Sequence, residues 1–131
     1  MAKEWSGKEM LIRKFKDWKF DRKMAKQRAK KGYCDLDVWN INDFIETTLV
    51  KMLKEFIKEN NGYPPELTPN EWDNILNRMI FLLTEMNEET CSKQIKLGDS
   101  SKKYLEVARY RDKCKNEFYN LLKKWHWALW W

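Results

Sequence analysis

Residues 28–43, RAKKGYCDLDVWNIND, mark the point at which this chain changes both its structure and its charge. A basic segment leads up to Gly32, and a glycine just past a helix end can take the left-handed conformation that closes the last turn. Asn42 or Asp43 can then cap a new helix, because their side chains accept hydrogen bonds from its first free N–H groups. The stretch therefore predicts a helix that ends near Lys31, a loop, and a second helix.

Working outward from this stretch, four segments show apolar residues at the spacing of an α-helix. The third has the clearest start: Thr68 is a good N-cap, Pro69 suits the first helical position, and Glu71 can close a capping box. The expected helices run from about residue 7 to 31, from 42 or 43 to about 60, from 69 to about 87, and from about 102 to near the C-terminus. We therefore expect an all-α protein, a compact bundle of about four main helices in one domain over residues 1–131.

The same spacing predicts which faces are buried. In the third helix we expect a core stripe that includes Trp72, Leu76, Met79 and Leu83, and in the second helix one that includes Met52 and Leu53. In the first helix the spacing lets three apolar residues face a core: Leu11, Phe15 and Trp18. Trp39, in the loop, is more typical of a core residue than of a surface on which bases stack.

Composition limits the class of protein. With 43% hydrophobic and 15% aromatic residues, 131 residues can build a core, so disorder is not expected. The three cysteines are widely spaced and odd in number, which favours reduced thiols over a disulfide framework. The sequence has no long apolar run, so we expect no signal peptide or membrane span, and a cytoplasmic location.

Charge is strongly segregated along the chain. Residues 1–32 carry twelve Lys/Arg and four Asp/Glu, residues 33–92 carry four and twelve, and residues 93–131 carry ten and four. These blocks could neutralise one another within the fold. Alternatively, a basic face stays free for an anion such as a nucleotide, a nucleic acid or an anionic membrane.

The basic block suggests a candidate ligand site. Seven Lys/Arg lie within residues 19–31, directly before Tyr33 and Trp39, so phosphate contacts and stacking surfaces could lie together. A guanidinium can hold a phosphate with two hydrogen bonds and also lie on an aromatic ring. The expected ligand-binding residues are Arg22, Lys26, Arg28, Lys30, Tyr33 and Trp39. The alternative is a solvated face whose cations stabilise the helix C-terminus.

Signals for catalysis or metal binding are weak. The chain has no glycine-rich phosphate loop, no zinc-protease motif and only one histidine, His126. Asp35 and Asp37 are better explained by turns and caps than by a divalent cation, and the glutamates near residue 88 have no neighbouring histidine. We therefore expect a non-enzymatic protein with no metal and no cofactor.

The chain ends in WHWALWW, which carries more aromatic surface than one buried face needs. Such an end is an aggregation hazard unless it docks on the core or on another subunit. The three residues beyond the buried face are Trp127, Trp130 and Trp131. They predict an interface between copies of this chain.

Several short sequence patterns, spread along the chain, together carry a resemblance to a family of proteins. The residues that carry them are Arg28-x-x-Lys31-Gly32-Tyr33-Cys34 with Asp37-x-Trp39, Gly62-Tyr63-Pro64, Glu71-Trp72-Asp73 with Ile75-Leu76-x-Arg78-Met79, and the closing Ala128-Leu129-Trp130-Trp131. With these anchors the chain resembles a family of small proteins encoded by bacteriophages and prophages. The resemblance implies an accessory protein in the host bacterial cytoplasm, and it implies no activity and no site residues.

Three functions remain open at this point. The first is a counter-defence protein that binds an anionic ligand, either a nucleotide signal or a nucleic acid. The second is a protein-binding inhibitor of a host defence enzyme, which would use tryptophans and arginines as hot spots. The third is a structural or assembly factor that oligomerises through its C-terminal aromatic residues.

Overall fold

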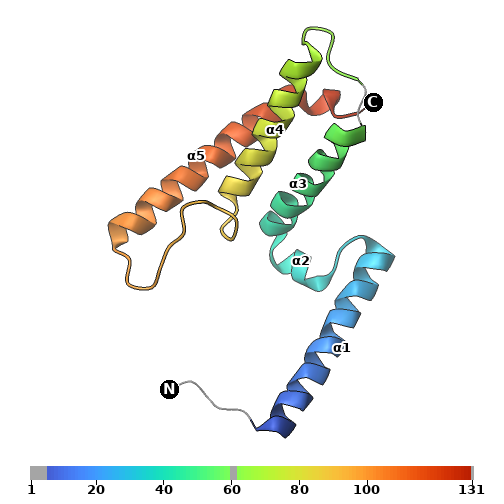
Figure 1. Cartoon of the computed structure of the whole chain (residues 1–131), viewed down its shortest axis with the longest axis vertical. Helices are drawn as coiled ribbons and strands as arrows, with labels where there is room; N and C mark the ends of the chain where they lie inside the picture. The colour runs from blue at the N-terminus through green and yellow to red at the C-terminus, as the bar shows by residue number, and fades with distance from the viewer. Residues whose placement is uncertain (1–5, 60–61, 131) are drawn as a thin grey trace. The chain divides into compact units, whose positions relative to one another are not determined.

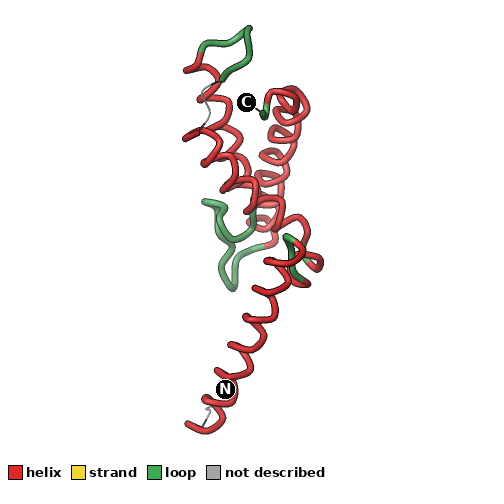
Figure 2. Tube along the Cα trace, turned by 90° about the vertical axis from the view of Figure 1, so that its right-hand side faces the viewer, coloured by secondary structure: helices red, strands yellow, loops and turns green. Residues whose placement is uncertain are grey.

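The computed structural model describes residues 6–59 and 62–130, and every regular element in these ranges is a helix (Figures 1 and 2). The all-α expectation with four long helices is confirmed. The elements are α1 (Gly7–Lys31), α2 (Asp35–Trp39), α3 (Ile41–Glu59), α4 (Pro69–Met86), α5 (Ser101–Trp125) and the 3-10 helix η1 (His126–Ala128). The short helix α2 was not expected. The chain divides into two compact units, residues 1–41 and 42–131.

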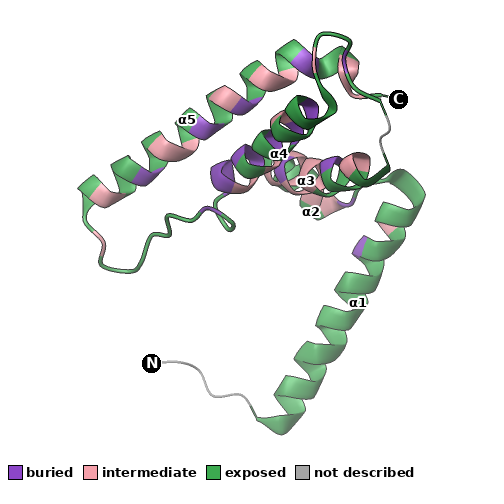
Figure 3. Ribbon diagram, turned by 45° about the horizontal axis from the view of Figure 1, so that its top comes forward, coloured by how far each residue is buried: buried purple, intermediate pink, exposed green. Residues whose placement is uncertain are grey.

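The core of residues 42–131 lies mainly between α4 and α5, with α3 and η1 packed against it. Buried positions recur on the inner faces of α4 and α5 in Figure 3. Trp72 is buried, as expected, and its ring meets that of Trp125 edge to face with centroids 5.7 Å apart. Leu53 of α3 is also buried, but Met52 is 61% exposed, so its assignment to the core was wrong. Successive helical residues point in directions about 100° apart, and the face that α3 turns to the core includes Leu53 but not Met52.

The helix ends follow the capping signals of the sequence. Thr68 accepts a hydrogen bond from the Glu71 N–H, and the Glu71 carboxylate accepts one from the Thr68 N–H, which confirms the capping box of α4. Ser6 and Glu9 form the same motif before α1. Gly32 has φ +84°, the left-handed conformation expected past the end of α1.

Polar contacts of two arginines help to fix α4 against α5. Arg78 donates two hydrogen bonds, of 2.6 and 2.9 Å, to the Glu117 carboxylate. At the end of α4, Arg111 Nε donates to the Met86 carbonyl over 2.9 Å, so a side chain from α5 satisfies a carbonyl that the helix leaves free. These contacts set the register of the two helices beyond what apolar packing alone specifies.

In residues 1–41, the short α2 folds back on the C-terminal part of α1. Gln27 and Asp35 exchange two hydrogen bonds, in which Gln27 Nε2 donates to the carboxylate over 3.0 Å and the Asp35 N–H donates to Gln27 Oε1 over 2.9 Å. Arg28, the residue after Gln27, donates two hydrogen bonds to the Asp37 carboxylate. The stretch that changes the charge of the chain therefore also forms the α1–α2 corner.

Most of α1 is exposed, as Figure 3 shows. Leu11, Phe15 and Trp18 are 69%, 62% and 54% exposed, so the expectation that they face a core was wrong. Trp39 is 71% exposed and is not a core residue either. The physical reason is the shortness of the partner: within the described part of residues 1–41, the helix that packs on α1 is α2, and its five residues cannot cover the long face of α1.

None of the described helices combines the length and the apolar composition that a membrane span requires.

Candidate functional site: the basic face of α1

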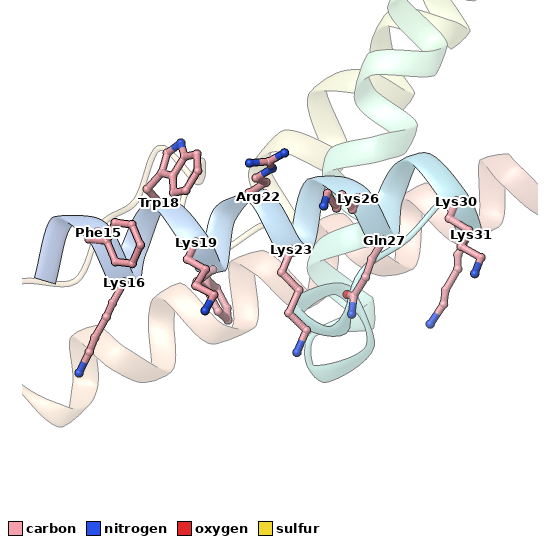
Figure 4. A pocket seen from close by; sticks show the side chains of 11 residues that line it. Phe15, Lys16, Trp18, Lys19, Arg22, Lys23, Lys26, Gln27, Lys30 and Lys31 are labelled. Atoms are coloured by element: carbon pink, nitrogen blue, oxygen red, sulfur yellow. The ribbon is translucent and has the colours of Figure 1, made fainter. Parts of the chain in front are cut away.

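A row of lysines runs along one face of α1. Lys16, Lys19, Lys23, Lys26 and Lys30 follow one another at intervals of three and four residues, which places them on the same side of a helix. All five are exposed and line a pocket whose described lining residues all belong to α1 (Figure 4). At about 1.5 Å per residue, the row is about 21 Å long. We call it the lysine row.

An aromatic edge borders the lysine row. Phe15 and Trp18 lie with ring centroids 6.1 Å apart, and the Arg22 guanidinium lies 5.4 Å from the Trp18 ring centroid. Figure 4 shows Trp18 and Arg22 on a different edge of α1 from Lys16, Lys19 and Lys23. Arg22 thus contacts an aromatic ring, as its chemistry favours. The ring is that of Trp18, which the spacing had assigned to a core.

Arg28 is engaged within the protein. Its Nε and Nη2 donate to the Asp37 carboxylate over 3.3 and 3.1 Å, and the Cys34 N–H donates to the same carboxylate over 2.8 Å. The Arg28 hydrogen bond, aided by that of the Cys34 N–H, lowers the pKa of Asp37 to about 2. Arg28 therefore presents fewer free donors to a ligand than Arg22 does.

The remaining predicted ligand residues are exposed. Tyr33 is 46% exposed and lies in the loop after Gly32, and Trp39 ends α2. Lys26 and Lys30 belong to the lysine row, but no described contact joins Tyr33 or Trp39 to them. Sequence reasoning missed Phe15, Trp18 and the N-terminal half of the lysine row. Their three-and-four spacing was visible, but the spacing does not reveal that the short α2 is the helix that packs on α1 within the described part of residues 1–41.

Net charge distinguishes the two units. Residues 1–41 carry twelve Lys/Arg and six Asp/Glu, a net charge of +6, whereas residues 42–131 carry fourteen of each and are neutral. Because each residue of an α-helix is rotated by about 100° from the one before, Asp17 and Asp21 lie on the side of α1 opposite the lysine row. The excess positive charge of the chain therefore lies in the unit that contains the lysine row.

The C-terminal tryptophans form a separate feature within residues 42–131. Trp127 and Trp130 are 85% and 74% exposed, so they do not dock on the core, while Trp131 lies outside the described residues. Trp127 and Trp130, together with Tyr63, Pro64 and other residues near them, line a hollow of about 490 Å³.

No group of His, Cys, Asp and Glu among the described residues is arranged to hold a metal ion.

Comparison with known proteins gives no match to this chain, whether with protein-family models, with curated proteins or with solved structures.

Proposed function

We propose that this protein is a non-enzymatic binder of nucleic acid and that the lysine row of α1 is its contact surface. The observation that carries the proposal is the row itself: five exposed lysines on one face, beside an exposed Trp18 that is paired with Arg22. Lysine ammonium groups neutralise phosphates and release condensed counterions, which supplies affinity without sequence specificity. An exposed indole and a guanidinium both offer flat surfaces on which an unpaired base stacks.

The length of the row favours a polymer over a single nucleotide. A nucleic-acid strand in a duplex carries one phosphate per about 3.4 Å of axis, so a row of about 21 Å spans on the order of six phosphates. A single nucleotide would engage only a small part of this surface. The resemblance to phage-encoded proteins suggests that such binding serves counter-defence in the host bacterial cytoplasm.

The test compares two variants of equal charge. One replaces three exposed lysines of the row, as Lys19→Gln/Lys23→Gln/Lys26→Gln. The control replaces three exposed lysines of α5, as Lys102→Gln/Lys113→Gln/Lys123→Gln. Fluorescence anisotropy with labelled single-stranded and duplex oligonucleotides at low salt should show binding to the wild type. We expect the α1 variant to bind at least about tenfold more weakly and the control to bind nearly as well as the wild type.

Two results would contradict the proposal. Equal weakening in both variants would mean that overall charge, and not the lysine row, drives the binding. Binding to anionic phospholipid vesicles without binding to either oligonucleotide would mean that α1 is an interfacial helix, since such helices also combine lysines with Trp, Phe and Leu.

The exposed C-terminal tryptophans support a second candidate function, inhibition of a host protein. Trp127 and Trp130 are highly exposed at the end of α5, and exposed tryptophans are frequent hot spots of protein–protein interfaces. This observation favours an inhibitor that binds a host defence enzyme. Under this function, affinity-tagged protein from infected cells should capture a host protein. Trp127→Ser/Trp130→Ser should abolish the capture, and the lysine-row variant should leave it intact.

A further inference from the structure

A smaller hollow lies within residues 42–131, between α3, α4 and the loop that follows α4. Its volume is about 240 Å³, and its lining residues are Glu46, Thr47, Val50, Lys51, Lys54, Leu83, Thr84, Asn87 and Thr90. Pockets for drug-sized ligands usually measure about 300–1,000 Å³, whereas a liquid water takes about 30 Å³. The hollow therefore suits a molecule smaller than most drugs, of the size of a common metabolite.

Glu46 is the unusual member of this lining. It is 4% exposed, yet no described residue donates a hydrogen bond to its carboxyl group. Burial raises the pKa of Glu46, and Arg111 opposes that rise. Glu85, which is 5% exposed, accepts hydrogen bonds from the N–H and hydroxyl of Ser92 and from the Tyr110 hydroxyl. Among the described residues, the one fully buried side-chain polar atom without a partner is Trp72 Nε1, so the Glu46 oxygens keep some access to the hollow that Glu46 lines. Glu46 is thus an acceptor left open on the hollow.

The other polar side chains in the hollow add acceptors but few donors. Three threonine hydroxyls donate within the protein: Thr47 to the Asp43 carbonyl, Thr84 to the Ile80 carbonyl, and Thr90 to the Thr84 carbonyl. Asn87 Nδ2 likewise donates to the Asp43 carboxylate over 2.8 Å. Because these protons are already used, the inner lining complements a group with several donors and no acceptor, which describes an ammonium.

The rest of the lining indicates two further features of the ligand, an anionic group and a short apolar side chain. Lys51 and Lys54 are exposed, so their ammonium groups can meet an anionic group of a ligand at the mouth of the hollow. Val50 and Leu83 provide apolar surface for a short side chain. We propose that this hollow binds a small zwitterion of the α-amino-acid class, with its ammonium at Glu46 and its carboxylate toward Lys51 and Lys54. No α1 lysine is among the lining residues, so this proposal stands apart from nucleic-acid binding.

The first test uses the unchanged protein and a matched ligand series. Isothermal titration calorimetry would compare free alanine, valine and leucine with their N-acetyl derivatives, which lack the ammonium, and with their amides, which lack the carboxylate. We expect saturable binding of at least one free amino acid and at least about tenfold weaker binding of both of its derivatives, because each derivative loses a charge-assisted contact. Absence of saturable binding at millimolar concentration, or equal binding of a derivative, overturns the proposal.

The second test uses two variants of α3. Glu46→Gln keeps the shape of the side chain but removes its charge, and we expect it to bind the amino acid at least about tenfold more weakly. Glu55→Gln makes the same change at an exposed position of the same helix and should bind as the wild type does. Wild-type affinity in a folded Glu46→Gln variant overturns the proposal. If that variant does not fold, the ligand series alone decides.

Discussion

At the scale of single residues, Asp37 explains why residues 28–43 form a corner. Its carboxylate accepts hydrogen bonds from Arg28 at the end of α1 and from the Cys34 N–H at the start of α2. One side chain thereby joins two helices and caps the second of them. The Asp37 carboxylate also pairs with the guanidinium of Arg28. Arg28 is therefore less available to a ligand than the exposed lysines of the lysine row.

We expect Asp37 to titrate with a pKa near 2, because the charged form keeps the Arg28 and Cys34 hydrogen bonds. Carbon-detected NMR of the aspartate carboxyl groups measures this directly. Arg28→Gln should move the pKa toward its ordinary value of about 3.9, while Arg22→Gln should leave it unchanged. Since folding lowers this pKa, the stabilising contribution is present above about pH 4 and is lost as the pH falls toward 2. An ordinary pKa in the wild type would mean that the pair does not persist in solution.

Among the described residues of the 42–131 unit, Trp72 is the largest fully buried side chain. Trp72→Ala should destabilise the protein by about 3–5 kcal/mol, as expected when a large aromatic leaves a cavity. Urea denaturation followed by circular dichroism measures the change. Leu97→Ala, at a fully exposed position, serves as the control and should change the free energy of unfolding by less than about 0.5 kcal/mol. Equal effects of the two substitutions would contradict the assigned core.

At the scale of elements, a buried polar cluster holds the loop after α4. Glu85 of α4 accepts a hydrogen bond of 2.6 Å from Tyr110 of α5 and two from Ser92 in the loop. Burial disfavours the charged form of Glu85, but these hydrogen bonds more than offset that effect and lower its pKa. The hydrogen bond that Tyr110 donates to the Glu85 carboxylate also raises the pKa of Tyr110. The loop that contributes Thr90 to the Glu46 hollow is thus anchored by a carboxylate on α4.

Tyr110→Phe should lower the free energy of unfolding by about 1–3 kcal/mol, because it removes one donor from a buried carboxylate. Tyr119→Phe makes the same change at a position that is 44% exposed and should be nearly neutral. Thermal unfolding of both variants, followed by circular dichroism at neutral pH, compares them. A Tyr110→Phe variant as stable as the wild type would show that the cluster contributes little to folding.

The elements also show what can be predicted from sequence. The α4 capping box and the Gly32 helix end depend on neighbouring residues, and local patterns identified both. The position of Trp39 and of the α1 aromatic edge depends on which element packs against them, and no local pattern contains that information. The Glu46 hollow was missed for the same reason, because its lining combines α3, α4 and a loop.

At the scale of the whole molecule, the exposed C-terminal tryptophans predict self-association. Trp127 and Trp130 are both highly exposed near the end of α5, and exposed apolar patches often mark interaction sites. We expect a two-fold dimer, the commonest symmetric assembly, by light scattering at micromolar concentration. Trp127→Gln/Trp130→Gln should shift the protein to a monomer, while Tyr104→Gln, at another exposed aromatic position, should not. A monomeric wild type would contradict this prediction and favour a heterologous partner.

Charge at the same scale gives the sharpest test of nucleic-acid binding. Each phosphate neutralised on a duplex adds about −0.9 to the slope of log K against log salt concentration. Arg22 is free of any carboxylate among its described contacts, whereas Arg28 is held by Asp37. Arg22→Gln should therefore make the slope about 0.9 less steep, and Arg28→Gln should change it much less. Equal changes for the two variants would mean that the Arg28–Asp37 pair opens on binding. A salt-independent affinity would mean that phosphates are not the ligand.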